Sequence, residues 1–199
     1  MVYRVSRFIC LIALKVLFRL EISGRENIPD KGPFIFASNH ISYLDPVVVG
    51  VASFRKLIFL AKEELFKPSS FSALLHLLSC LPLKRSGFDI SALKQSLAVL
   101  KRGLPIAIFP QGTRSREESR IHSGVGFLSL KSGVPVVPVK VCNTDKALPP
   151  GRIFPCFCKI KVLIGRPYFA DKSMSYEDIA KEIFKRISSL GDCIRAEDR

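Results

Sequence analysis

The chain has 199 residues, of which 48% are hydrophobic. This size and composition suit one folded domain and exclude a disordered chain, which would be poor in aliphatic and aromatic residues. Lys and Arg total 31 against 17 Asp and Glu, so the formal net charge is +14. Such a charge favours an anionic partner: nucleic acid, an anionic bilayer or a small phosphorylated substrate, among which charge alone does not choose.

Residues 1–20 have the pattern of a basic amphipathic helix. Four cations (Arg4, Arg7, Lys15 and Arg19) fall on an arc of roughly 120° at about 100° per residue, and the rest of the wheel is apolar. The uncharged run 8–14 is shorter than the roughly 20 apolar residues that cross a bilayer, and no small-residue cleavage site marks a signal peptide. Two interpretations stay open: a helix on an anionic membrane surface, which we favour, or one packed on the domain with its charges outward.

After a turn-rich stretch, apolar runs alternate with helical patterns, which favours an α/β layer fold for residues 21–199. Short apolar runs typical of buried strands occupy 34–37, 57–61, 106–109, 136–141 and 160–164. Helical patterns occupy 46–53, 71–78, 90–101 and 176–190. Ser175 with Asp178 predicts a capping box at the start of the last helix.

A histidine and an aspartate follow the first of these strands, in Asn39-His40-Ile-Ser-Tyr-Leu-Asp45-Pro46. Across a tight turn, Asp45 can accept from one ring nitrogen of His40 and leave the other to take a proton from a substrate hydroxyl. This is the base and orienter of a serine-hydrolase triad without the serine, so the substrate alcohol would be the nucleophile. The alternative is structural: Asp45 as a helix N-cap before a proline, and His40 as a core residue.

Three further motifs follow. Phe109-Pro-Gln-Gly-Thr-Arg-Ser115 combines a turn glycine with hydroxyls and a guanidinium, an inventory that suits a phosphate monoester, although a polar turn would use the same residues. Leu81-Pro-Leu-Lys84-Arg85 is an apolar run that ends in two cations, and Val134-Pro-Val-Val-Pro-Val139 is a strand with prolines.

The six cysteines form no C-x-x-C pair, and only Cys156 and Cys158 lie close together in the sequence, so the spacing of a metal site is missing. We therefore predict no metal site, and free thiols in a reducing compartment. A nucleic-acid-binding module would need cations interleaved with stacking aromatic residues or a known motif, and the sequence has neither.

Taken together, the four motifs resemble those of the glycerolipid acyltransferase family, in order and interval, and most closely its 1-acyl-sn-glycerol-3-phosphate acyltransferase branch. They run from Asn39 to Val139, about half of the chain. The resemblance implies a three-layer fold with a mixed β-sheet flanked by helices, membrane association on the cytoplasmic face, and no cofactor. Together with the pattern of residues 1–20, it predicts an acyltransferase domain over residues 21–199 that follows a membrane-associating helix over residues 1–20.

The resemblance also implies residue roles. It makes His40 the general base and Asp45 its partner. It places Arg85 and the residues Gln111, Gly112, Thr113 and Arg114 at the acceptor's phosphate and glycerol, and Lys62 is a looser match to a phosphate-contacting lysine. The chain departs from the family at one position, because Gln111 stands where the family usually has Glu.

The expected reaction moves a fatty acyl group from acyl-CoA or acyl-carrier protein to the 2-hydroxyl of 1-acyl-sn-glycerol 3-phosphate, giving phosphatidic acid. The partners would then be that lysophospholipid, the thioester donor and an anionic membrane surface, without nucleic acid. Glycerol 3-phosphate or another lysophospholipid remains open as acceptor. A non-catalytic lipid-binding relative is the alternative of a different class.

Overall fold

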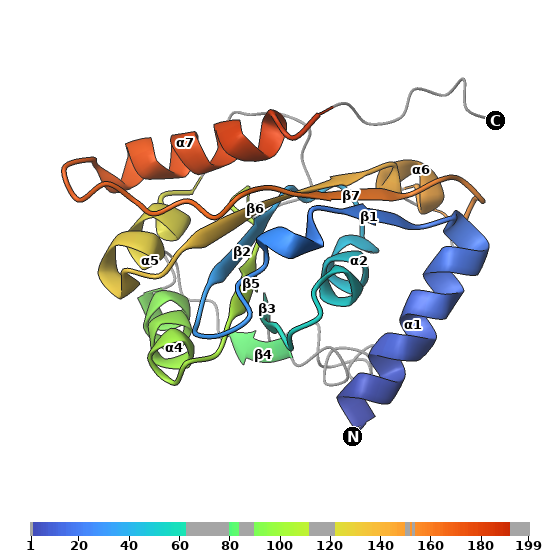
Figure 1. Ribbon diagram of the computed structural model, residues 1–199, viewed down its shortest axis with the longest axis horizontal. Coiled ribbons are helices and arrows are strands. Elements are labelled where there is room, and N and C mark those ends of the chain that lie inside the picture. Colours follow the sequence, from blue (N-terminus) through green and yellow to red (C-terminus); the bar gives the residue numbers. More distant parts are fainter. Residues whose placement is uncertain are drawn as a thin grey trace.

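The computed structural model describes residues 2–62, 80–83, 90–111, 122–149, 152 and 154–191. Their strands form one mixed sheet in the order β1-β7-β6-β2-β5-β3-β4 (Figure 1). Only the β6–β7 pair is antiparallel among the described strands. The strands are β1 (Glu21–Ser23), β2 (Ile35–Ser38), β3 (Ile58–Lys62), β4 (Cys80–Leu83), β5 (Ile106–Ile108), β6 (Val136–Cys142) and β7 (Lys161–Ile164).

Helices cover both faces of this sheet, so the predicted three-layer α/β fold is confirmed. On one face lie α1 (Val2–Phe18) and α2 (Asp45–Ala52). On the other lie α4 (Ile90–Lys101), α5 (Gly124–Ser132) and α7 (Tyr176–Ser188) (Figure 1). The short helix α6 (Thr144–Ala147) follows β6, and a 3-10 turn (Arg25–Asn27) follows β1.

The central strand β2 divides the hydrophobic core in two. Phe34 and Phe36 belong to the cluster beneath α1 and α2, whereas Ile35 and Ala37 belong to the cluster beneath α4, α5 and α7. Side chains alternate between the two faces of a strand, so a strand covered on both sides reads as a continuous apolar run. This is the pattern that predicts a buried strand here.

The five predicted strands are present with ends within one residue of those expected, and the predicted helices 46–53, 90–101 and 176–190 correspond to α2, α4 and α7. The predicted helix 71–78 lies outside the described residues. The elements β1, β4, α5 and α6 were not predicted from the sequence. For α5 the reason is physical: Gly126 weakens the helical pattern, yet a Cβ there would lie 2.0 Å from the Tyr176 carbonyl oxygen, so the packing of α7 requires glycine.

The predicted capping box at the start of α7 is confirmed in part. The Ser175 side chain accepts a hydrogen bond from the Asp178 N–H at 3.1 Å, which satisfies one free donor of the first turn. Its hydroxyl also donates to the Asp178 carboxylate at 2.7 Å.

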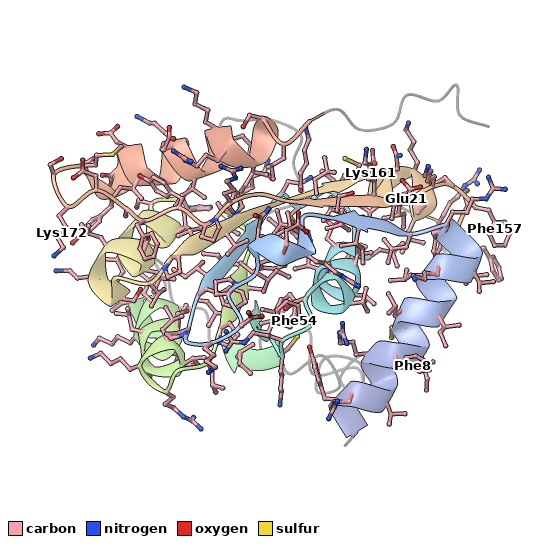
Figure 2. All side chains as sticks on the ribbon, viewed as in Figure 1. Phe8, Glu21, Phe54, Phe157, Lys161 and Lys172 are labelled. Carbon is pink, nitrogen blue, oxygen red and sulfur yellow. The ribbon has the colours of Figure 1, made fainter. Side chains whose placement is uncertain are left out.

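Helix α1 packs on the domain along one side and leaves the other exposed. Leu14 and Phe18 are buried in the core, and the Arg7 Nε donates to the Ser53 carbonyl at 2.8 Å. Arg7 therefore differs from the three exposed cations Arg4, Lys15 and Arg19. The exposed side carries large apolar side chains, among them Phe8 (Figure 2). In the described part of the chain, no helix has the length and apolar character needed to cross a membrane.

The cysteines are not all free thiols, contrary to the expectation from the sequence. Cys10, Cys80, Cys156 and Cys158 are free thiols, but Cys142 is disulfide-bonded, so the prediction of free thiols was wrong for that residue. Burial raises the pKa of the Cys80 thiol to about 12, so this thiol is protonated near neutral pH.

Candidate active site

A partly buried turn between β2 and α2 is anchored to the neighbouring strand by the side chain of Asn39. Its Nδ2 donates to the Val141 carbonyl at 2.9 Å, and its Oδ1 accepts from the Val141 N–H at 2.7 Å. The amide therefore continues the pairing of β2 with β6 beyond the last backbone pair, Ser38 with Val139. The chain must then leave the sheet at His40, at a position set by β6.

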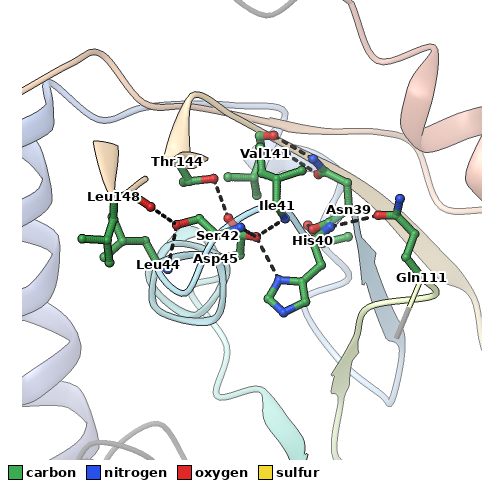
Figure 3. Close-up of polar contacts among 11 residues, drawn as sticks. Asn39, His40, Ile41, Ser42, Leu44, Asp45, Gln111, Val141, Thr144 and Leu148 are labelled. Atoms are coloured by element: carbon green, nitrogen blue, oxygen red, sulfur yellow. Dashed lines mark hydrogen bonds and ion pairs between the residues drawn. The ribbon is translucent and has the colours of Figure 1, made fainter. Parts of the chain in front are cut away.

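Within this turn His40 meets Asp45 as predicted (Figure 3). His40 Nδ1 lies 2.9 Å from Asp45 Oδ2. The same carboxylate oxygen accepts from the N–H groups of Ile41 at 2.6 Å and Ser42 at 2.7 Å. Asp45 thus orients the imidazole and also closes the turn that carries it.

The alternative interpretation of Asp45 as a helix N-cap is wrong. Helix α2 begins at Asp45 itself, the cap position is Leu44, and no side chain caps the helix. Pro46 stands in the first turn of α2, where its missing N–H costs nothing. The carboxylate is therefore directed at the turn before the helix.

The second carboxylate oxygen has a partner that the sequence analysis did not find. The Thr144 hydroxyl donates to Asp45 Oδ1 at 2.6 Å, and both residues are fully buried. With His40, Ile41 and Ser42, this makes four donors to one carboxylate, which is the saturation that a buried charge needs. Thr144 lies 99 residues further along the chain and belongs to no motif.

Two residues at the end of β5 hold the other side of His40. The imidazole stacks on the Phe109 ring with centroids 4.3 Å apart and an interplanar angle of 24°. Gln111 is buried, and its Oε1 accepts from the His40 backbone N–H at 3.2 Å. With Nδ1 donating to Asp45, the tautomer assigned from these partners leaves Nε2 as the acceptor.

No serine near His40 in the chain occupies the place of a triad nucleophile. The Ser38 hydroxyl donates to the Asn39 carbonyl at 3.1 Å, and the Ser42 hydroxyl donates to the Leu148 carbonyl at 3.4 Å. Both hydroxyls are therefore committed to backbone. An imidazole that is oriented by a carboxylate and keeps Nε2 as an acceptor can take a proton from another molecule.

Among the predicted substrate-binding residues, Lys62 ends β3, and Gln111 follows β5. The parallel register aligns Phe59 of β3 with Ala107 of β5, and Ala107 with Phe36 of β2. Lys62 and Gln111 therefore stand at the same carboxyl edge of the sheet as His40, where α/β proteins place their ligands. Arg85, Gly112, Thr113 and Arg114 lie outside the described residues, in segments that follow β4 and β5 in the chain.

The chain matches a known protein family. A family model described as Acyltransferase matches residues 19–142, more than half of the chain. The chain belongs to this acyltransferase family. The matched region includes both members of the His40–Asp45 pair and ends just before Thr144.

Individual relatives are also named as acyltransferases. The acyltransferase-family chain is 28% identical over 163 residues to the 1-acyl-sn-glycerol-3-phosphate acyltransferase of Bacillus subtilis (strain 168), covering 79% of this chain and 80% of that protein. It is 27% identical over 168 residues to a chloroplastic 1-acyl-sn-glycerol-3-phosphate acyltransferase of Brassica napus, covering 81% of this chain but 48% of the relative. The chain thus spans about half the length of the plant relative that it matches.

A solved structure shares the fold. The crystal structure of the 1-acyl-sn-glycerophosphate acyltransferase PlsC from Thermotoga maritima superposes with a TM-score of 0.79 at 26% identity. The match covers 94% of this chain and 78% of that chain. In the part of the chain that the structure describes, no group of three or more His, Cys, Asp or Glu side chains is placed to hold a metal ion.

Proposed function

We propose that the chain is a 1-acylglycerol-3-phosphate O-acyltransferase. It transfers a fatty acyl group from a thioester, acyl-CoA or acyl-carrier protein, to the 2-hydroxyl of 1-acyl-sn-glycerol 3-phosphate, and the product is phosphatidic acid for phospholipid biosynthesis. The observation that carries this proposal is the 2.9 Å contact between His40 Nδ1 and Asp45 Oδ2, with neighbouring serine hydroxyls bonded to backbone. The names of the relatives supply the substrate class.

The chemistry follows from the free ring nitrogen. Nε2 of His40 takes the proton of the acceptor hydroxyl as its oxygen forms a bond to the thioester carbonyl carbon. The imidazolium that forms is stabilised by the ionised Asp45. The tetrahedral oxyanion then collapses, the carbon–sulfur bond breaks, and His40 returns its proton to the thiolate. We propose the backbone near Gly112 as the oxyanion donor.

The acceptor phosphate defines a second part of the proposed site. Arg114, Arg85 and Lys62 supply cations for it, with Thr113 and Gln111 as polar neighbours. Support comes from the parallel strands, because β3 and β5 bring Lys62 and Gln111 to the edge that carries His40. No metal and no bound cofactor enters the proposed reaction.

The proposed location is a membrane surface on the cytoplasmic side, reached through residues 1–20. Support comes from the exposed side of α1, which combines apolar side chains with Arg4 and Lys15. A lysophospholipid acceptor resides in the bilayer, so an enzyme that acts on it gains from lying at the interface. Residues 21–199 form the proposed acyltransferase domain.

The decisive experiment measures thiol release from acyl-CoA by the purified chain with a panel of acceptors in detergent micelles. Lysophosphatidate, glycerol 3-phosphate, lysophosphatidylcholine and monoacylglycerol are compared, and acyl-carrier protein replaces CoA in a second series. We expect turnover with lysophosphatidate that His40→Ala removes. Turnover only with glycerol 3-phosphate or another lysolipid would reassign the acceptor, and lipid binding without turnover on any acceptor would identify a non-catalytic relative.

A further inference from the structure

A short segment between α6 and β7, residues 154–160, presents two of the most exposed aromatic side chains in the described part of the chain. Phe154 is 83% exposed and Phe157 is 77% exposed. We call this segment the aromatic loop. A large ring left in water forgoes the favourable free energy of burial, so two such rings in one short loop indicate a partner that covers them.

The aromatic loop lies beside the carboxyl end of α1. The Ile160 N–H donates to the Phe18 carbonyl at 2.9 Å, and Lys159 forms an ion pair with Glu21 at 2.8 Å. In Figure 2, Phe157 lies past the end of α1 on the side to which Phe8 also points. The outer face of α1 consists of exposed apolar residues on one arc of the helix: Val5, Phe8, Ile9, Ile12 and Val16. The loop therefore extends this face beyond the end of the helix.

Cations border this combined surface. Arg4, Lys15 and Arg19 are exposed on or directly after α1, and Lys146 and Arg152 are exposed on the chain that leads into the aromatic loop. Glu21 faces the surface too, but Lys159 neutralises it. Apolar side chains bordered by cations match the chemistry of an anionic bilayer, in which rings enter the acyl boundary and cations remain at the phosphate level.

We infer that the aromatic loop is a second lipid-contact element, which inserts Phe154 and Phe157 into the anionic membrane surface that the outer face of α1 also contacts. The inference rests on the proposed lipid-surface activity and adds a residue set outside residues 1–20. The loop is also hydrogen-bonded to α6. The Cys156 N–H donates to the carbonyl of Ala147, the last residue of α6, at 2.7 Å, and α6 begins at Thr144, the partner of Asp45.

The experiment uses the absence of tryptophan from this chain. Phe157→Trp introduces a unique fluorophore into the aromatic loop. Phe169→Trp is the matched control, because this ring is also exposed, at 65%. It lies at the other end of β6: its neighbour Tyr168 pairs with Val136 at the start of β6, whereas the aromatic loop bonds to residues beyond the end of β6. Each full-length variant is titrated with vesicles of phosphatidylglycerol and phosphatidylcholine, with and without brominated acyl chains.

We expect a blue shift and bromine quenching for Phe157→Trp, and neither for Phe169→Trp. The double substitution Phe154→Ser with Phe157→Ser should weaken vesicle partitioning about tenfold or more, whereas Phe169→Ser should leave it unchanged. Because these rings lie outside the proposed catalytic site, thiol release in detergent micelles should match the parent chain for all four variants.

Parent-like partitioning of the double variant, or equal responses of the two tryptophans, would overturn the inference. A blue shift without vesicles that grows with protein concentration would also overturn it, since it would identify a second copy of the chain as the partner. Turnover in detergent micelles distinguishes a failure of this inference from a failure of the proposed function. If the parent chain has no turnover in micelles, the proposed function fails, and the vesicle data still decide the role of the loop.

Discussion

The proposed catalytic turn, residues 39–45, and the outer face of α1 differ in whether their side chains have partners. In the turn, the Asp45 carboxylate receives four hydrogen bonds, and its ring partner His40 is held from the backbone as well as through Nδ1. On the outer face, large apolar side chains are exposed. Burial and saturation fix geometry to fractions of an ångström, whereas an uncovered apolar face is suited to a fluid partner that sets no geometry.

The largest expected effect comes from removing the base. His40→Ala should lower turnover on lysophosphatidate about 10²–10⁴-fold, the range that general-base catalysis supplies. The melting temperature should change little, because His40 is half-buried and its backbone contact to Gln111 survives. Near-normal turnover of a folded variant, measured by thiol release, would refute the mechanism.

Asp45→Asn should be almost as severe for turnover and worse for stability. The amide can present an N–H where the imidazole expects an acceptor, which selects the wrong tautomer, and it accepts more weakly from Ile41, Ser42 and Thr144. We expect at least a hundredfold loss in kcat, by analogy with the loss of the carboxylate in a triad, together with a lower melting temperature than His40→Ala. A variant with full activity would show that the Asp45 carboxylate only shapes the turn.

Neutralising the exposed cations of α1 tests the other region. Arg4, Lys15 and Arg19 changed together to Gln should weaken partitioning onto anionic vesicles by roughly 1 kcal/mol for each charge, so by about a hundredfold in all. High salt should reproduce part of the loss in the parent chain. The matched control changes Lys94, Lys101 and Arg102 to Gln, three exposed cations on α4 or directly after it, on the opposite side of the sheet. Equal losses in both variants would mean that net charge alone drives binding.

Thr144 allows a finer test of the catalytic turn. Thr144→Val keeps the shape but removes the donor to Asp45 Oδ1, which leaves a buried acceptor short of one partner at a cost of about 1–3 kcal/mol. As a positioning residue, it should lower kcat about tenfold with little change in KM, and Thr144→Ser should restore most of the rate. If Thr144→Ser were as impaired as Thr144→Val, methyl packing rather than the hydrogen bond would be the function of the residue.

The smallest expected effect concerns Gln111. A glutamate would still accept from the His40 N–H, so Gln111→Glu should stay within about tenfold of the parent, a window of roughly 1.4 kcal/mol in the barrier. The parent chain should be active as it stands. Turnover of both proteins on lysophosphatidate is the measurement, and an inactive parent that Glu rescues a hundredfold or more would show that the position needs a negative charge.

Local sequence predicted the parts of the site that lie close together in the chain. His40 and Asp45 are five residues apart, and a turn after a strand is enough to bring them into contact. The buried strand β2 could also be predicted from the sequence, because a strand covered on both faces is a continuous apolar run. The motif order also indicated the family before any comparison of folds.

Only the tertiary structure showed which distant groups complete the site and which face of α1 remains free. Thr144 reaches Asp45 because β6 lies next to β2 and ends beside the catalytic turn, a neighbourhood created by sheet order and carried by no local signal. On α1, the wheel placed Arg7 with the other cations, but packing turned its guanidinium to the Val51 and Ser53 carbonyls. Periodicity specifies which residues share a face of a helix, whereas the neighbouring elements decide which of those faces is covered.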